Sequence, residues 1–140
     1  MTIPNSYIFL PLLLQVLLTV AVYLALSAAK SRALEQGLVD LERRALHEDA
    51  WPESVQKINN NIRNQFEVPV LFYVLVITLY LIDAAGPLAQ VLAWLFVGSR
   101  MLHAYIHTGA NDVPARRAAF MFGCVVVLAM LIVAIPAVFA

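Results

Sequence analysis

The stretch "NNIRNQFEVPVLFYVLVITLYL", from Asn60 to Leu81, decides the fold class because it changes from charged to apolar within a few residues. Arg63 and Glu67 precede the charge-free run 68–82, which is 15 residues long. A helix needs about 20 apolar residues to cross a bilayer. Glu67 is therefore expected at or below the membrane interface, where an ionised side chain is costly and needs a partner.

The composition of the whole chain is that of a membrane protein. Of its 140 residues, 62% are hydrophobic and 13% charged, against roughly 45–50% and about 25% in soluble domains. The lone cysteine, Cys124, excludes an intrachain disulfide and is interpreted as a buried structural residue. No basic patch interleaved with aromatic residues is present, which argues against nucleic-acid binding.

Four segments are apolar enough to cross the membrane as helices. The spans are about 4–29, 66–82, 87–107 and 117–139, with a polar cytoplasmic loop at 30–57. The third reaches the needed length only if Arg100 and His103 are counted inside it. The sequence thus predicts a single domain, 1–140, with an all-α fold: an integral membrane four-helix bundle in contact with membrane lipid.

The distribution of Lys and Arg predicts the orientation of this bundle. Eight of them lie on one side: Lys30, Arg32, Arg43, Arg44, Lys57, Arg63, Arg116 and Arg117. By the positive-inside rule that side is cytoplasmic, and both termini face away from the cytoplasm. The lack of an endoplasmic retention signal favours a bacterial inner membrane.

Two faces are expected on the helix that leads into the second span. Its apolar face holds Val55, Ile58, Ile62 and Phe66. Its polar face holds Asn60, Arg63, Asn64 and Glu67. Both sets follow helical spacing, so each forms a coherent stripe. Pro69 is expected to remove a backbone hydrogen bond and bend the helix.

The third span carries a matching polar face. Arg100, His103 and His107 have i, i+3, i+7 spacing. The turn before this span is short, so the second and third spans should form an antiparallel hairpin. Counted from Ala85, Glu67 and His103 are each 18 residues away, while Arg63 and His107 are each 22 away. We therefore expect these pairs at equal depth, with Arg100, His103 and His107 as partners of Arg63 and Glu67.

Two simpler interpretations of these charges stay open. Arg63 and Glu67 could form a local i, i+4 ion pair, worth about 0.3–0.5 kcal/mol, with Arg100 reaching to the membrane surface. His103, His107 and Glu67 could instead provide three zinc ligands. No Glu follows the first His as in metalloprotease helices, and arginines nearby disfavour a cation, so no metal is predicted.

A polar stripe is also expected within the first span. Gln15, Thr19, Tyr23 and Ser27 recur at every fourth residue. We expect this stripe to face other helices, where polar side chains find partners that lipid cannot provide.

With these features the chain resembles the membrane-associated proteins in eicosanoid and glutathione metabolism, the MAPEG family. The resemblance covers nearly the whole chain, and its most specific parts are "RNQFE", "GSRMLHAYIH" and "VPARR". It implies a homotrimer of four-helix subunits that binds glutathione between subunits near the cytoplasmic side. The positions that it assigns to the glutathione site are Arg63, Asn64, Glu67, Arg100, His103 and Arg116. His107, where the family has a Tyr, is counted with them.

Glutathione, as a co-substrate, suits such residues chemically. Arginines can grip its carboxylates while Glu67 takes its amine. A nearby guanidinium lowers the pKa of a thiol and so favours the reactive thiolate. Arg116 and Arg117 are the catalytic candidates. The expected activity is conjugation or reduction of a lipophilic small molecule, as in a glutathione S-transferase or peroxidase.

Two departures from the family pattern support an alternative. Asn60 stands where the eicosanoid synthases carry an Arg, and Phe120 where several members have a Tyr. A phenylalanine can neither donate a hydrogen bond to a thiolate nor accept a proton. The chain could therefore be a non-catalytic lipid-binding or scaffold protein of the same fold.

Overall fold

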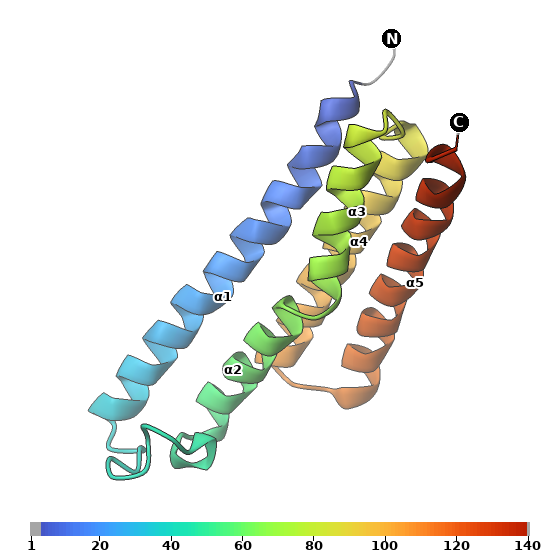
Figure 1. Cartoon of the computed structure of the whole chain (residues 1–140). Coiled ribbons are helices and arrows are strands. Elements are labelled where there is room, and N and C mark those ends of the chain that lie inside the picture. Colours follow the sequence, from blue (N-terminus) through green and yellow to red (C-terminus); the bar gives the residue numbers. More distant parts are fainter. Residues whose placement is uncertain (1–3, 140) are drawn as a thin grey trace.

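A computed structural model describes residues 4–139 of the chain, and these residues are helical without a strand (Figure 1). The helices are α1 (Phe9–Glu35), α2 (Glu53–Gln65), α3 (Val68–Leu81), α4 (Pro87–Thr108) and α5 (Val113–Ala137). Two short 3-10 turns, η1 (Asn5–Ile8) and η2 (Glu48–Ala50), precede α1 and α2. Since α2 and α3 together form one long, broken helix, the expected all-α four-helix bundle is confirmed.

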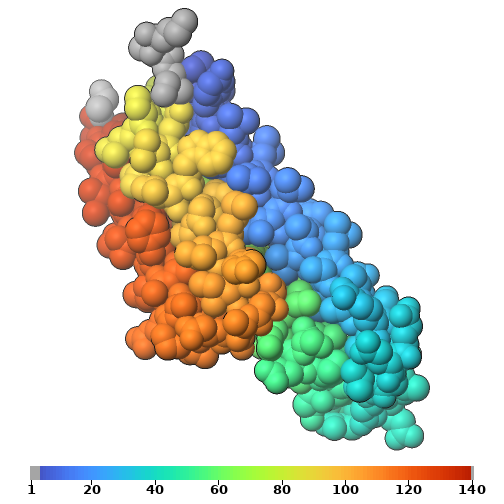
Figure 2. All heavy atoms as spheres, turned by 180° about the vertical axis from the view of Figure 1, so that it is seen from behind, coloured from blue at the N-terminus to red at the C-terminus, as the bar shows by residue number. Residues whose placement is uncertain are grey.

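The bundle has two distinct ends. The start of α1 and the end of α5 lie at one end, and the loop between α1 and α2 lies at the other (Figure 1). We call the latter the loop end. Seen from behind, α4 lies between α1 and α5 (Figure 2). This central position explains why α4 buries more polar side chains than its neighbours.

The second helix breaks where Pro69 was expected to bend it. α2 ends at Gln65, and α3 begins at Val68 with Pro69 in its first turn. Glu67 between them has φ −95° and ψ −105°, which is not helical. Proline has no N–H to donate to the Gln65 carbonyl, so the helical ladder is interrupted there. The break ends the apolar stripe early and leaves Phe66 exposed, contrary to our expectation.

Two apolar clusters hold the helices together. The larger one lies among α3, α4 and α5, and it includes the buried Met130 and the stacked rings of Phe72 and Phe96, whose centroids are 4.3 Å apart. The smaller one joins α1 to α2 at the loop end through residues such as Leu26 and Val55. Helix α2 contacts both α1 and α4.

Glycine allows α5 to approach α4 closely. A Cβ at Gly123 would lie 3.0 Å from the Ser99 hydroxyl, which itself donates to the Phe96 carbonyl. Such a contact is tighter than normal packing allows, so glycine permits this interface. The same contact places the Arg100 side chain against α5, 3.8 Å from that Cβ position.

Within the described residues, three helical segments are long and apolar enough to cross a membrane: Asn5–Glu35, Glu53–Leu81 and Val113–Ala137. α4 has sufficient length, but it carries Arg100, His103 and His107, which are buried inside the bundle. Helices α1 and α5 extend further toward the loop end than the spans proposed from apolarity. In α5 the extra turn is capped by Asp112, whose carboxylate accepts from the Ala115 amide at 2.8 Å.

Candidate functional site

A cavity of about 270 Å³ opens between the end of α2 and the facing ends of α4 and α5. Its lining residues are Asn64, His103, Val113, Arg116, Arg117 and Phe120. All but Val113 and Phe120 are site residues predicted from the sequence. The helices therefore bring much of the expected polar set to one place.

Arg100 lies in the interior next to this cavity and is 0% exposed. One nitrogen, Nη2, donates to the Asn64 carbonyl at 3.0 Å. That carbonyl belongs to the last turn of α2, where helical acceptors have no backbone partner, so Arg100 caps the broken helix. Nε and Nη1 have no hydrogen-bond partner within residues 4–139. The guanidinium lies 5.7 Å from the Phe120 ring centroid.

The two histidines of α4 have defined tautomers. His103 Nδ1 lies 3.2 Å from the Arg116 carbonyl, and since a carbonyl only accepts, Nδ1 carries the proton. Its buried Nε2 has no partner in the described chain and is left as an acceptor. His107 Nδ1 lies 3.4 Å from the amide nitrogens of both Asn61 and Asn64 and accepts from them. Each ring is therefore oriented by a neighbouring helix.

These contacts test the depth predicted from the hairpin. Arg63 was expected level with His107, and its chain neighbour Asn64 is the residue that reaches this ring. Arg100, which the same count places about one turn deeper than His103, reaches the Asn64 carbonyl with its long side chain. The contact of Asn64 with His107 thus agrees with the sequence count to within about one residue.

A buried amide network adjoins the site and was not predicted. Gln15 of α1 donates to Gln65 at 2.8 Å, and Gln65 donates to Asn61 at 3.0 Å. All three side chains are at most 1% exposed. A signal was present in the sequence, because Gln65 lies three residues after Ile62 and thus on the apolar side of α2. A polar residue on an apolar face indicates a buried hydrogen-bond partner.

The polar stripe expected on the first span is only partly correct. Gln15 is buried, and Thr19 is half-buried with its hydroxyl donating to the Gln15 carbonyl. Tyr23 and Ser27 are exposed instead. Four residues turn a helix by about 400°, so the stripe drifts by roughly 40° at each step and leaves the packed face.

Arg63 and Glu67 do not have the partners expected for them. Arg63 forms an ion pair with Glu48 of the α1–α2 loop, and Asn59 donates to the same carboxylate oxygen. Glu67 is exposed and forms no ion pair within residues 4–139. The prediction that both pair with Arg100, His103 and His107 is wrong for the single subunit. The local Arg63–Glu67 pair is not formed either, because α2 ends between them.

The predicted site residues thus divide into two groups. Asn64, Arg100, His103, His107, Arg116 and Arg117 gather in and around the cavity. Arg63 and Glu67 lie on the outer surface, as does Asn60. The zinc alternative needed Glu67 beside the two histidines, and the described chain holds no cluster of three His, Cys, Asp or Glu suited to a metal.

Comparison with known proteins agrees with the helical membrane architecture. The model of the MAPEG family matches residues 7–136, nearly the whole chain. No curated protein and no solved structure gave a match. The match spans all the helices described above, including the three membrane-spanning candidates. The chain is therefore an integral membrane protein that belongs to the MAPEG family.

Proposed function

We propose that this protein is a glutathione-dependent membrane enzyme that conjugates or reduces a lipophilic substrate. One observation carries the proposal. Arg100 is a fully buried cation with two nitrogens, Nε and Nη1, unpartnered in the described chain, and it adjoins a cavity lined by two further arginines. An isolated buried cation is costly. A carboxylate ligand would supply the missing hydrogen bonds and neutralise the charge.

The exposed residues fit a site shared between subunits. Arg63 and Glu67 are both exposed, and Arg63 is paired with Glu48 rather than with a residue that lines the cavity. In a homotrimer they would face a neighbouring subunit, and a ligand bound there could contact both groups of residues. Arg63 would then bind a carboxylate of glutathione and Glu67 its ammonium group.

Arginine side chains are the groups in this site that could activate the glutathione thiol. Phe120 lines the cavity and has no hydroxyl, so thiolate stabilisation would depend on Arg116 and Arg117. Arg116 is held by the Asn111 side-chain oxygen, which fixes its guanidinium beside the cavity. Either guanidinium would favour the thiolate over the thiol. The lipophilic substrate would arrive through the membrane.

We further propose that the loop end faces the cytoplasm and that the membrane is a bacterial inner membrane. Lys and Arg gather at this end, as the positive-inside rule requires. Glutathione, a water-soluble tripeptide, would then enter from the cytoplasm.

A second candidate function is non-catalytic lipid binding or scaffolding with the same fold. Phe120 favours it, because the ring packs 5.8 Å from His103 and provides no proton donor in the cavity. Turnover of chlorodinitrobenzene with glutathione above the uncatalysed rate would exclude it.

Glutathione at millimolar concentration is expected to raise the melting temperature of the detergent-solubilised protein, and Arg63→Ala should remove the rise. A ligand at ~100 times its Kd stabilises the native state by about 2.7 kcal/mol. Arg32→Ala, which removes an exposed arginine of α1, serves as the matched control and should keep the rise. If the parent protein shows no shift, the proposed function fails.

Glu48→Gln should tighten glutathione binding. The Glu48 carboxylate occupies the Arg63 guanidinium that the ligand would need, so glutathione has to displace it. The pair is exposed and worth up to about 1 kcal/mol, which corresponds to a roughly fivefold lower Kd. Calorimetric titration measures the change. Glu42→Gln removes an exposed carboxylate of the same loop, and an equal gain there would indicate a general charge effect.

A further inference from the structure

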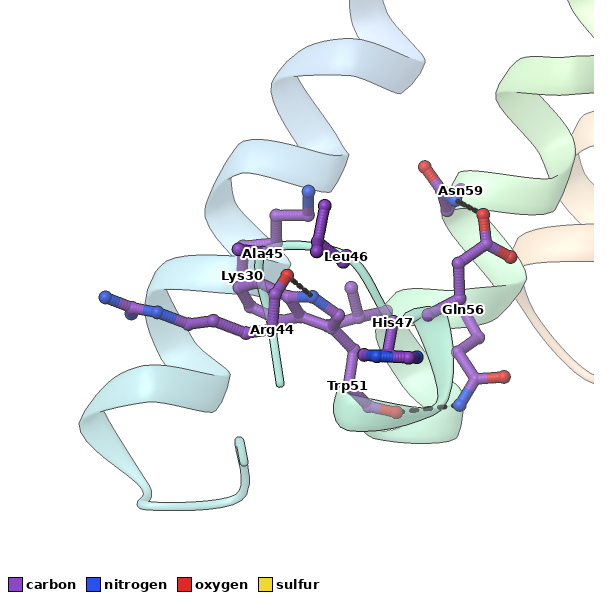
Figure 3. Close-up of a pocket in the computed structure, with 10 residues that line it drawn as sticks. Lys30, Arg44, Ala45, Leu46, His47, Trp51, Gln56 and Asn59 are labelled. Carbon is purple, nitrogen blue, oxygen red and sulfur yellow. Dashed lines mark hydrogen bonds between the residues drawn. The ribbon is translucent and has the colours of Figure 1, made fainter. Parts of the chain in front are cut away.

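A second cavity, of about 260 Å³, lies at the loop end between α1 and α2 (Figure 3). It is separate from the α4–α5 cavity and shares no lining residue with it. Its wall includes Lys30 of α1, Val55 of α2, and His47, Glu48 and Trp51 of the loop. Neither the glutathione proposal nor the family match assigns it a role.

The loop that forms this cavity is held in place by hydrogen bonds. The Leu38 amide donates to the Ala33 carbonyl and the Asp40 amide to the Ala50 carbonyl, each at 3.0 Å. Trp51 is fixed at both ends. Its indole donates to the Arg44 carbonyl at 3.2 Å, and its own carbonyl accepts from Gln56 at 2.7 Å (Figure 3).

Most charges around the cavity are already paired. Arg43 binds Asp49 at 2.8 Å, and this contact holds the pKa of the Asp49 carboxyl below its ordinary value. Glu48, the carboxylate on the wall, is paired with Arg63. Lys57 lies 3.7 Å from Glu53. Most carboxylates of the loop region thus form ion pairs with cations that do not line the cavity.

Two cations at the cavity are not paired in this way. Within residues 4–139, neither Lys30 nor Arg44 has a carboxylate within 4.0 Å. The Lys30 ammonium lies 4.9 Å from the Trp51 ring centroid, which orients it without neutralising it. In Figure 3 the Arg44 side chain points away from His47 and Gln56, while its carbonyl accepts from the Trp51 indole. The cavity therefore carries uncompensated positive charge.

The position of Lys30 places the cavity at the membrane interface. Lys30 is the first charged residue after the charge-free part of α1, Phe9–Ala29, which is long enough to cross the hydrocarbon core. Lysine and tryptophan side chains are favoured where the hydrocarbon meets the headgroups. The anionic group available at that depth is the phosphate of a phospholipid.

We infer that this cavity binds the headgroup phosphate of an anionic phospholipid. The Lys30 ammonium provides the direct contact, Trp51 holds that ammonium in place, and Arg44 adds attraction at the rim. The inference needs only a membrane around α1 and does not depend on glutathione.

Phosphatidylglycerol, phosphatidylcholine and inorganic phosphate are the probes for the test. In a Trp94→Phe background, emission reports Trp51 alone, because the chain has two tryptophans. Phosphatidylglycerol titrated into phosphatidylcholine micelles should change the emission saturably, and native mass spectrometry should detect retained phosphatidylglycerol. Lys30→Ala should weaken the apparent affinity about fivefold, the effect of one interfacial lysine. Arg44→Ala, which keeps the contact with the indole, should weaken it less.

Arg32→Ala is the matched control. Arg32 is an exposed cation of the same helix end whose Nε donates to the Ala28 carbonyl, and it does not line this cavity. An equal loss of apparent affinity for phosphatidylglycerol in Arg32→Ala would show that only general surface charge matters, and it would overturn the inference. So would equal retention of both lipids. Saturation by inorganic phosphate without any response to phosphatidylglycerol would overturn the lipid assignment.

Discussion

Replacing Arg100 with methionine is expected to cut the glutathione-dependent rise in melting temperature to about a third or less, while leaving the ligand-free protein within about 1 kcal/mol of the parent. In the ligand-free protein the substitution has two opposing effects on the free energy of unfolding. Losing the hydrogen bond to the Asn64 carbonyl costs about 1.5–3 kcal/mol. Removing a buried guanidinium with two unpartnered nitrogens stabilises the protein by a similar amount, because exchange of buried charges for apolar groups often stabilises by ~1–4 kcal/mol.

In glutathione binding, by contrast, nothing offsets the loss of the Arg100 charge. A ligand carboxylate that meets methionine in place of the buried cation loses its charge partner, which costs at least about 2 kcal/mol, or a roughly 30-fold higher Kd. Melting curves with and without glutathione measure both effects, and Arg32→Met provides the exposed-arginine control. A strongly destabilised Arg100→Met protein would instead show that Arg100 acts mainly as the cap of α2.

The helical architecture was predictable because membrane helices follow simple rules. Length and apolarity indicate the spans. Because the turn between α3 and α4 is short, these two helices are expected to form an antiparallel hairpin. Residue counting along that hairpin then aligned Asn64 with His107 to within about one residue. The break at Pro69 was also predictable, since a missing N–H has the same consequence in any helix.

Side-chain partners were less predictable, for two physical reasons. Helical periodicity identifies a face but not the helix that covers it, so Gln65 of α2 was not recognised as the partner of Gln15 on α1. Periodicity also gives no information about a folded loop. Glu48 reaches Arg63 because the loop returns along α2, and no spacing rule describes that path. Both errors concern contacts across sequence separations that local patterns do not cover.

Gln65→Leu is expected to destabilise the protein by about 2–4 kcal/mol. The Gln65 side chain accepts from Gln15 and donates to Asn61, and all three are buried. Leucine would leave the Gln15 amide nitrogen and the Asn61 carbonyl oxygen without partners, and each unsatisfied buried group costs about 1–3 kcal/mol. Unfolding in mixed detergent and SDS micelles measures the loss.

The double variant Gln15→Leu/Gln65→Leu separates lost pairing from lost packing. With both amides replaced, the unpaired Gln15 nitrogen no longer exists, so the double variant should be more stable than the sum of the single effects by about 1–2 kcal/mol. Thr19→Val, which removes a hydroxyl that donates to the Gln15 carbonyl of the same helix, is the control and should cost little. Strict additivity would mean that the Gln15–Gln65 hydrogen bond contributes nothing to the packing of α1 on α2.

The same variants report on the site, because Asn61 also donates to His107. If the network positions that ring, Gln65→Leu should weaken glutathione binding in molecules that remain folded, whereas Thr19→Val should not.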